Sequence, residues 1–373
     1  MLYWLLYPLT NWWFGFNVFR YITFRATFAA VTAFVVSLLL GPIVIRRLRA
    51  ANLGEKVRRG EDYRSIEKEH SHKEGTPTMG GLLILVAVLG STLLWARLDL
   101  APAWVAMGAM AWMGAVGFLD DLIKLRGRPG RRGLPGRVKL LGQVLLGLGV
   151  SWFLFGASET AEWAPQMMVP FSKHPLLYIG PGAVLFTILV IAGSSNAVNL
   201  TDGLDGLAIG CLGIASLAFA VLAYVTGHAG LADYLNILFI PGAGELTVFC
   251  ATLVGASLGF LWFNSYPAQV FMGDTGSLAC GAAIGTVAVL IRKELFLLLV
   301  GGVFVAEAVS VLSQKFYFKL TRRLYGQGRR IFLCAPLHHH FQVRQVAENK
   351  ITVRFWICAI ICALLGIGAL KLQ

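Results

Sequence analysis

Ten long apolar segments, separated by polar connections, constrain this chain more than any other feature of its sequence. Each approaches the roughly 20 residues that an α-helix needs to cross a bilayer. Apolar residues make up 57% of the 373 and charged residues only 14%, which is not the balance of a water-soluble domain. We therefore predict one all-α polytopic membrane domain over residues 1–373, with about ten transmembrane helices. The segments are Tyr21–Ile45, Thr78–Ala96, Pro102–Leu119, Lys139–Phe155, Leu177–Val198, Leu204–Thr226, Leu246–Phe263, Thr275–Leu290, Leu295–Tyr317 and Ile351–Leu370.

The positive charges lie mainly in alternate connections. Lys and Arg are concentrated in the stretches 46–73, 124–139 and 315–350, whereas the connections between them are nearly free of basic residues. Because Lys and Arg of short loops stay on the cytoplasmic side, this pattern predicts cytoplasmic basic loops and two periplasmic termini. The formal net charge of +13 then indicates orientation and contact with membrane lipids, and no nucleic-acid partner is expected.

Two adjacent carboxylates, Asp120 and Asp121, end the third apolar segment. The helix dipole is negative at a C-terminus, so anions there need a cationic partner. Lys124, one turn later, supplies part of that charge, and Mg²⁺ or a substrate-bound cation would supply the rest. The alternative is a solvated pair of loop carboxylates. The cost of ionisable groups near a membrane favours a functional site.

A short turn between the fifth and sixth segments, residues 194–206, is rich in Asn, Asp and Gly. Asp202 or Asp205 could simply cap the sixth helix. Capping requires only one of them, however, and the clustering of small and acidic residues is typical of a turn that brings backbone close to a ligand. We therefore favour a binding role for this turn.

A third polar cluster lies between the seventh and eighth segments. It contains Asn264, Phe271 and Asp274. Asp274 could cap the eighth helix, be a metal ligand, or do both. Phe271 is either an anchor at the membrane interface or a flat surface on which a base can stack. The sequence alone leaves these alternatives open.

The remaining clusters are the run His338–His340, before the last segment, and Lys73–Gly81, before the second. Three consecutive His side chains cannot all face one way on a helix, so a single zinc site is disfavoured. Contact with phosphate or proton transfer suits them better, although an inconsequential surface run is the alternative. Lys73 and Thr78 lie in a stretch that either holds phosphate or simply starts a helix.

A secondary transporter would also place Asp and His inside a membrane protein. It would carry them near the middle of the bilayer, whereas every cluster here lies at the ends of apolar segments on the predicted cytoplasmic side. A soluble substrate can reach that face. Carboxylates, Lys and His under a basic surface favour an enzyme that joins a phosphorylated soluble substrate to a lipid, with Mg²⁺ between them.

Five motifs in order resemble those of the polyprenyl-phosphate N-acetylhexosamine-1-phosphate transferases, nearly from end to end. The triple His favours the muramoyl branch of that family over its N-acetylglucosamine relatives, which are the runner-up. One departure is Gln342, where relatives often carry an acid. The motifs are Lys73–Gly81, Asp120–Asp121, Asn199–Gly206, Met272–Ser277 and Pro336–Phe341.

The resemblance implies ten transmembrane helices, a bacterial inner-membrane location, a homodimer and a Mg²⁺ requirement. It implies transfer of phospho-MurNAc-pentapeptide from UDP-MurNAc-pentapeptide to undecaprenyl phosphate, giving lipid I and UMP in peptidoglycan synthesis. By position, it implies catalytic roles for Asp120, Asp121, Asp274 and His338, with Asp274 as the Mg²⁺ ligand. Substrate-binding roles follow for Lys73, Thr78, Lys124, Lys139, Asn199, Asp202, Asp205, Asn264, Phe271, His339 and His340, with Phe271 stacking on uracil.

Overall fold

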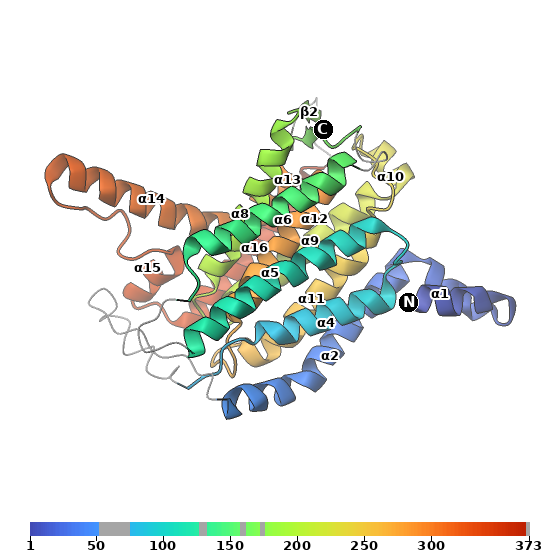
Figure 1. Cartoon of the computed structure of the whole chain (residues 1–373), viewed down its shortest axis with the longest axis horizontal. Coiled ribbons are helices and arrows are strands. Elements are labelled where there is room, and N and C mark those ends of the chain that lie inside the picture. The colour runs from blue at the N-terminus through green and yellow to red at the C-terminus, as the bar shows by residue number, and fades with distance from the viewer. Residues whose placement is uncertain (52–74, 127–132, 157–161, 172–175, 371–373) are drawn as a thin grey trace.

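The fold is a bundle of apolar helices, seen in a computed structural model that describes residues 1–51, 75–126, 133–156, 162–171 and 176–370 (Figure 1). Eight helices of the described residues are long and apolar enough to cross a membrane. The chain is thus a polytopic membrane protein. These helices are α2 (Ile22–Ala50), α5 (Ala101–Arg126), α6 (Gly136–Gly156), α8 (Gly182–Thr201), α9 (Leu207–Thr226), α11 (Glu245–Asn264), α12 (Gly273–Leu290) and α16 (Glu348–Gly368).

The other elements are shorter or flank these helices. The N-terminal stretch forms α1 (Leu2–Leu6), η1 (Tyr7–Asn11) and η2 (Phe14–Arg20). Further along lie α4 (Gly81–Trp95), α10 (Ala229–Tyr234), α13 (Glu294–Val300), α14 (Gly302–Tyr325) and α15 (Leu337–Val343). Two short strands, β1 (Gln166–Met168) and β2 (Leu176–Tyr178), pair antiparallel. Figure 1 shows α15 at one end of the bundle and β2, α10 and the N-terminus at the other.

All ten predicted segments contain helix, but two differ from a simple span. The second is only the 15-residue α4, which is short for a crossing. The ninth, predicted as one helix, is wrong in that detail, because α13 and α14 meet at an angle of 88°. The break falls at the pair Gly301 and Gly302, and paired glycines bend helices because they fix the backbone least. The hairpin β1–β2 also departs from a purely helical fold.

Helix α12 forms the centre of the bundle, where every residue from Thr275 to Leu290 is buried. It packs against α5, α8 and α4. Small residues allow this: a Cβ placed on Gly117 of α5 would lie 2.2 Å from the carbonyl oxygen of Asp274, and one on Gly81 of α4 would lie 2.1 Å from the nitrogen of Gly276. Glycines at such crossings let helix backbones approach closely within a membrane. The close crossing brings the start of α12 against the end of α5.

Candidate active site

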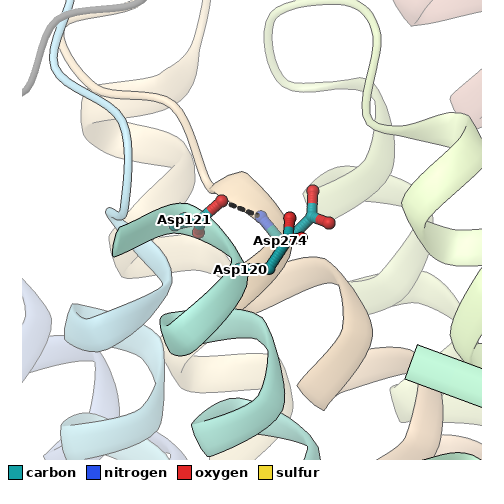
Figure 2. Close-up of side chains that lie close together, drawn as sticks. All are labelled: Asp120, Asp121 and Asp274. Carbon is teal, nitrogen blue, oxygen red and sulfur yellow. Dashed lines mark hydrogen bonds between the residues drawn. The ribbon is translucent and has the colours of Figure 1, made fainter. Parts of the chain in front are cut away.

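Three carboxylates converge where α5 ends and α12 begins (Figure 2). One oxygen each of Asp120, Asp121 and Asp274 lies within 4.8 Å of the others. Asp120 and Asp121 are buried, and the side chain of Asp274 is 13% exposed. Residues 153 positions apart in the sequence therefore form one acidic cluster, open to solvent mainly on the side of Asp274.

Asp121 holds the first turn of α12 from the neighbouring helix. Its carboxylate accepts hydrogen bonds from the backbone N–H groups of Asp274 (3.2 Å) and Thr275 (2.9 Å), and from the Thr275 hydroxyl (2.7 Å). These N–H groups have no partner within α12, so Asp121 does the work of a capping residue. The alternative that Asp274 is the N-cap residue of α12 is wrong, because Met272 holds that position and Asp274 lies within the first turn.

Two lysines neutralise part of the acidic cluster. Lys124 Nζ lies 2.6 Å from Asp120 Oδ2 and 2.9 Å from Asp274 Oδ1, as the spacing of Lys124 and Asp120 on α5 predicted. Lys139, in the first turns of α6, lies 3.0 Å from Asp120 Oδ2 and also forms a short ion pair with Asp274. Both lysines therefore bridge Asp120 and Asp274.

The donor set of this cluster fits a hard divalent cation. Three carboxylates and two ammonium groups leave one net negative charge, and carboxylate oxygens are the ligands that Mg²⁺ prefers. Because both oxygens of Asp121 accept hydrogen bonds from α12 and Asp120 Oδ1 accepts the N–H of Leu134 at 2.6 Å, the oxygens left for a metal are those of Asp274 and Oδ2 of Asp120. Their pairing with Lys124 and Lys139 also means that cations already compete for these oxygens.

The turn between α8 and α9 lies beside the start of α12. Asn199, at the end of α8, accepts a hydrogen bond from the Ser277 hydroxyl at 2.8 Å. The alternative that Asp202 or Asp205 is the N-cap residue of α9 is wrong, since that position is held by Gly206, in a left-handed conformation. Neither Asp202 nor Asp205 therefore has the N-cap role at α9.

Asp205 and Asn264 join this turn to the connection that precedes α12. The Asp205 carboxylate accepts the N–H of Ala268 at 3.0 Å. Asn264 accepts the N–H of Gly206 at 3.1 Å and donates to the carbonyl of Val270 at 2.9 Å. Both side chains are buried. These contacts fix the backbone of the connection between α11 and α12, which carries Phe271 and leads directly to Asp274.

Thr78 and Phe271 are brought together by backbone pairing. The N–H of Phe271 donates to the carbonyl of Pro77 at 2.8 Å, and the N–H of Gly80 donates to the carbonyl of Phe271 at 2.8 Å. A Cβ placed on Gly273 would lie 3.0 Å from the Thr78 hydroxyl oxygen. Thr78 therefore borders the start of α12, whereas Lys73 lies outside the described residues.

The three histidines face different ways, as expected for consecutive positions on the short helix α15. His338 is fully buried, and His339 Nδ1 lies 2.7 Å from Gln342 Oε1. His340 Nδ1 accepts the N–H of Leu333 at 3.1 Å. Burial, with a smaller contribution from Arg344, lowers the pKa of His340, which favours the neutral ring that this hydrogen bond requires.

One buried acid beside the histidines was missed by the sequence motifs. Glu307 of α14 is fully buried, and its Oε1 accepts the backbone N–H of His338 at 3.2 Å. A sequence signal did exist, because Glu307 is the only acidic residue in the predicted segment Leu295–Tyr317, and an ionisable residue within a membrane segment is a candidate for function.

Comparison with known proteins places this arrangement within one family. Residues 103–292 match the family described as glycosyl transferase family 4, a stretch that includes α6, α8, α9, α11, α12 and all but the first two residues of α5. Residues 73–85 match the first signature of phospho-N-acetylmuramoyl-pentapeptide-transferases. The family match thus contains all three carboxylates of the acidic cluster.

Curated relatives match over the full length of this chain and of their own. Phospho-N-acetylmuramoyl-pentapeptide-transferases of Thermodesulfovibrio yellowstonii, Desulfosudis oleivorans and Gemmatimonas aurantiaca are each 48% identical to it, with 100% of both chains covered. The chain therefore belongs to the phospho-N-acetylmuramoyl-pentapeptide-transferase group of glycosyl transferase family 4, and it is a transferase enzyme.

Proposed function

We propose that this enzyme transfers phospho-MurNAc-pentapeptide from UDP-MurNAc-pentapeptide to undecaprenyl phosphate, forming lipid I and UMP. The observation that carries the proposal is the cluster of Asp120, Asp274, Lys124 and Lys139, in which carboxylates and ammonium groups alternate. Such a site can bind both a diphosphate and the metal that accompanies it. The name shared by the full-length relatives, phospho-N-acetylmuramoyl-pentapeptide-transferase, supports phospho-MurNAc-pentapeptide as the group that is transferred.

Asp274 would hold Mg²⁺, with Asp120 beside it. When bound, the ion would spread the charge that develops on the diphosphate. Lys124 and Lys139 contribute from the protein side: each would exchange a carboxylate contact for a phosphate oxygen when substrate enters. Asp121 keeps the first turn of α12 in place, and thereby keeps the Asp274 carboxylate at the end of α5.

The favoured reaction is one direct displacement. An oxygen of undecaprenyl phosphate forms a bond to the sugar-linked phosphorus, the bond from that phosphorus to the bridging oxygen breaks, and UMP leaves with the electron pair. Asp120 takes the remaining proton of the lipid phosphate when it carries one. Because the second pKa of such a phosphate is about 6, no strong base is required.

A two-step route through a phosphorylated Asp is the competing mechanism. Single-turnover mixing with radiolabelled UDP-MurNAc-pentapeptide in the absence of lipid distinguishes them. The direct route predicts no label on protein after rapid quenching. Label on the wild-type chain that disappears in Asp120→Asn would overturn it.

The remaining nucleotide contacts are assigned by position in the same proposal. Asn199, Asp202, Asp205, Asn264 and Phe271, together with Lys73 and Thr78, would form the nucleotide pocket, with uracil stacked on Phe271. His338, His339 and His340 would lie toward the sugar-phosphate. Since Asp205 and Asn264 are buried and bonded to backbone, their contribution would be to shape the pocket.

The proposal also includes a bacterial inner-membrane location, ten crossings, periplasmic termini, a cytoplasmic active site and a homodimer. Single cysteines introduced into a variant without native cysteines test the sidedness with an impermeant maleimide on intact spheroplasts. A cysteine at exposed Tyr234 of α10 is expected to react, and one at exposed Arg344 beside α15 is expected to react only after lysis. The opposite pattern would invert the topology.

The function itself is tested by UMP release from detergent-purified protein with undecaprenyl phosphate and Mg²⁺. UDP-MurNAc-pentapeptide and UDP-GlcNAc are offered separately, and Asp274→Asn is the inactive control. Turnover of the muramoyl substrate alone is expected. Turnover of UDP-GlcNAc instead would contradict the proposed substrate, and UMP release that is unchanged in Asp274→Asn would contradict the proposed site.

A further inference from the structure

Glu307 and His338 form a buried acid–imidazole couple outside the acidic cluster. Both residues are 0% exposed. Glu307 Oε1 lies 3.3 Å from Nδ1 of the His338 ring and accepts the His338 backbone N–H at 3.2 Å. One carboxylate oxygen therefore accepts a hydrogen bond from the first turn of α15 and also lies against the imidazole ring.

The other edge of the His338 ring meets the turn between α8 and α9. A Cβ placed on Gly203 would lie 2.2 Å from His338 Nε2, so only glycine lets the ring come this close. Gly203 stands between Asp202 and Asp205. His338 is thus packed between α14, which carries Glu307, and the turn to which the proposed function assigns nucleotide contacts.

The Glu307–His338 couple contributes little net stability to the fold. Burying a carboxylate beside an imidazole costs desolvation energy, and an apolar pair of similar volume is often as stable or more stable. Glu307 Oε2 and both ring nitrogens of His338 also have no hydrogen-bond partner within the described parts of the chain, so Nδ1 meets Glu307 as a close charge contact. Such an arrangement indicates a role in orienting the ring, because a carboxylate oxygen 3.3 Å from Nδ1 favours the ring form that carries hydrogen on that nitrogen.

We propose that Glu307 is a positioning residue for nucleotide binding: through His338 it fixes the turn of residues 202–206 that carries Asp202 and Asp205. This inference rests on the proposed function, since it assumes that the turn contacts the UDP part of the substrate. Loss of the Glu307 carboxylate leaves the acidic cluster intact. It lets the His338 ring rotate, and the turn shifts with it.

Glu307→Gln is the first variant, because it keeps the volume but offers Nδ1 an amide donor as well as an acceptor. We expect the KM for UDP-MurNAc-pentapeptide to rise about 10- to 100-fold, the range typical of residues that orient a ligand through another side chain. The KM for undecaprenyl phosphate should change less than about twofold, because its binding contacts are untouched. Glu307→Asp, which keeps the charge, should recover part of the loss.

A double-mutant cycle with His338→Gln tests whether Glu307 acts through His338. If it does, the double variant should bind the nucleotide about as weakly as the worse single variant, rather than showing the product of both losses. Calorimetric binding of UDP gives the same comparison without turnover. Glu245→Gln is the matched control, since Glu245 is also a buried, paired carboxylate but lies at the other end of the bundle.

Additive losses, or a lower melting temperature with unchanged KM and UDP affinity, would overturn the positioning role. Its failure is distinguishable from failure of the proposed function. In the first case wild-type protein still releases UMP from UDP-MurNAc-pentapeptide, and Glu307→Gln binds UDP as the wild type does. In the second case the wild type releases no UMP, whatever the behaviour of the couple.

Discussion

Buried charges occur at both ends of the helix bundle, but they are organised differently. At the start of α2 and α11, Arg25 and Glu245 pair with two parallel hydrogen bonds of 2.6 and 2.5 Å, and their side chains are 1% and 3% exposed. At the end of α5, three carboxylates share two lysines, with a net negative charge, and the Lys124 side chain is 33% exposed.

The difference separates an ion pair that stabilises the fold from a site that can bind a ligand. Each charged group of the Arg25–Glu245 pair meets its opposite in fixed geometry, and Glu245 also accepts the backbone N–H of Arg97 at 2.9 Å. In the acidic cluster, the oxygens of Asp274 pair with the ammonium groups of Lys124 and Lys139, which a cation or a phosphate can replace. Incomplete neutralisation at a partly open site therefore identifies the functional end.

The largest effect should come from Asp274→Asn. Removing this charge leaves Lys124 and Lys139 with one fewer carboxylate, and we expect UMP release to fall by about 1,000-fold, the upper range for loss of one electrostatic contact at a reacting phosphate. The melting temperature should stay close to that of the wild type, since Asp274 is partly exposed. Activity assays beside thermal unfolding check both statements. A large loss of stability with little loss of activity would reverse the comparison.

Arg25→Gln should behave in the opposite way. It leaves a buried Glu245 without its partner, and breaking such a pair costs about 3 kcal/mol of stability or more. The protein that remains folded should show nearly normal KM values. Thermal unfolding in detergent measures the cost. Adding Glu245→Leu should restore part of the stability, and failure of the second change to do so would show that Glu245 has other essential contacts.

Asp121→Asn sharpens the distinction inside the acidic cluster. Asparagine can accept from one N–H of α12 but presents a second donor to the other, so we expect a loss of about 1–2 kcal/mol in stability. Activity should fall less than in Asp274→Asn. Thr275→Val, which removes only the hydroxyl donor, is the matched control with an expected cost of about 1 kcal/mol. Equal activity losses in Asp121→Asn and Asp274→Asn would instead give Asp121 a direct catalytic role.

The smallest effect is expected at Asp99, in the connection between α4 and α5. Its carboxylate lies 2.6 Å from Arg97, and both side chains are about one-third exposed. The Arg97 hydrogen bond lowers the pKa of Asp99, so its contribution is present above the unfolded pKa and is lost as pH falls through the folded value. Asp99→Asn should cost less than about 0.5 kcal/mol near neutral pH. Unfolding measured at pH 7 and below pH 4 checks the size and sign, and a cost that grows at low pH would contradict this origin.

Sequence reasoning located the eight helices that are long and apolar enough to cross a membrane, because a helix in lipid must be apolar over a fixed length, which a linear pattern records. It also placed Lys124 beside Asp120, since that contact depends only on helical spacing. It did not anticipate the break between α13 and α14, because a pair of glycines permits a bend without requiring one. Local spacing also could not predict that Asp274 pairs with Lys124 of α5 and Lys139 of α6, because these contacts depend on how the helices pack.

The sequence by itself determined that this chain spans a membrane and which polar groups were available for chemistry, because both follow from composition and short motifs. Only the tertiary structure decided what each group does. It made Asp121 the cap of a helix that begins 152 residues later, and it made Glu307 the partner of His338. Buried polar groups must find partners wherever packing places them, and glycine contacts between α4, α5 and α12 set that packing here.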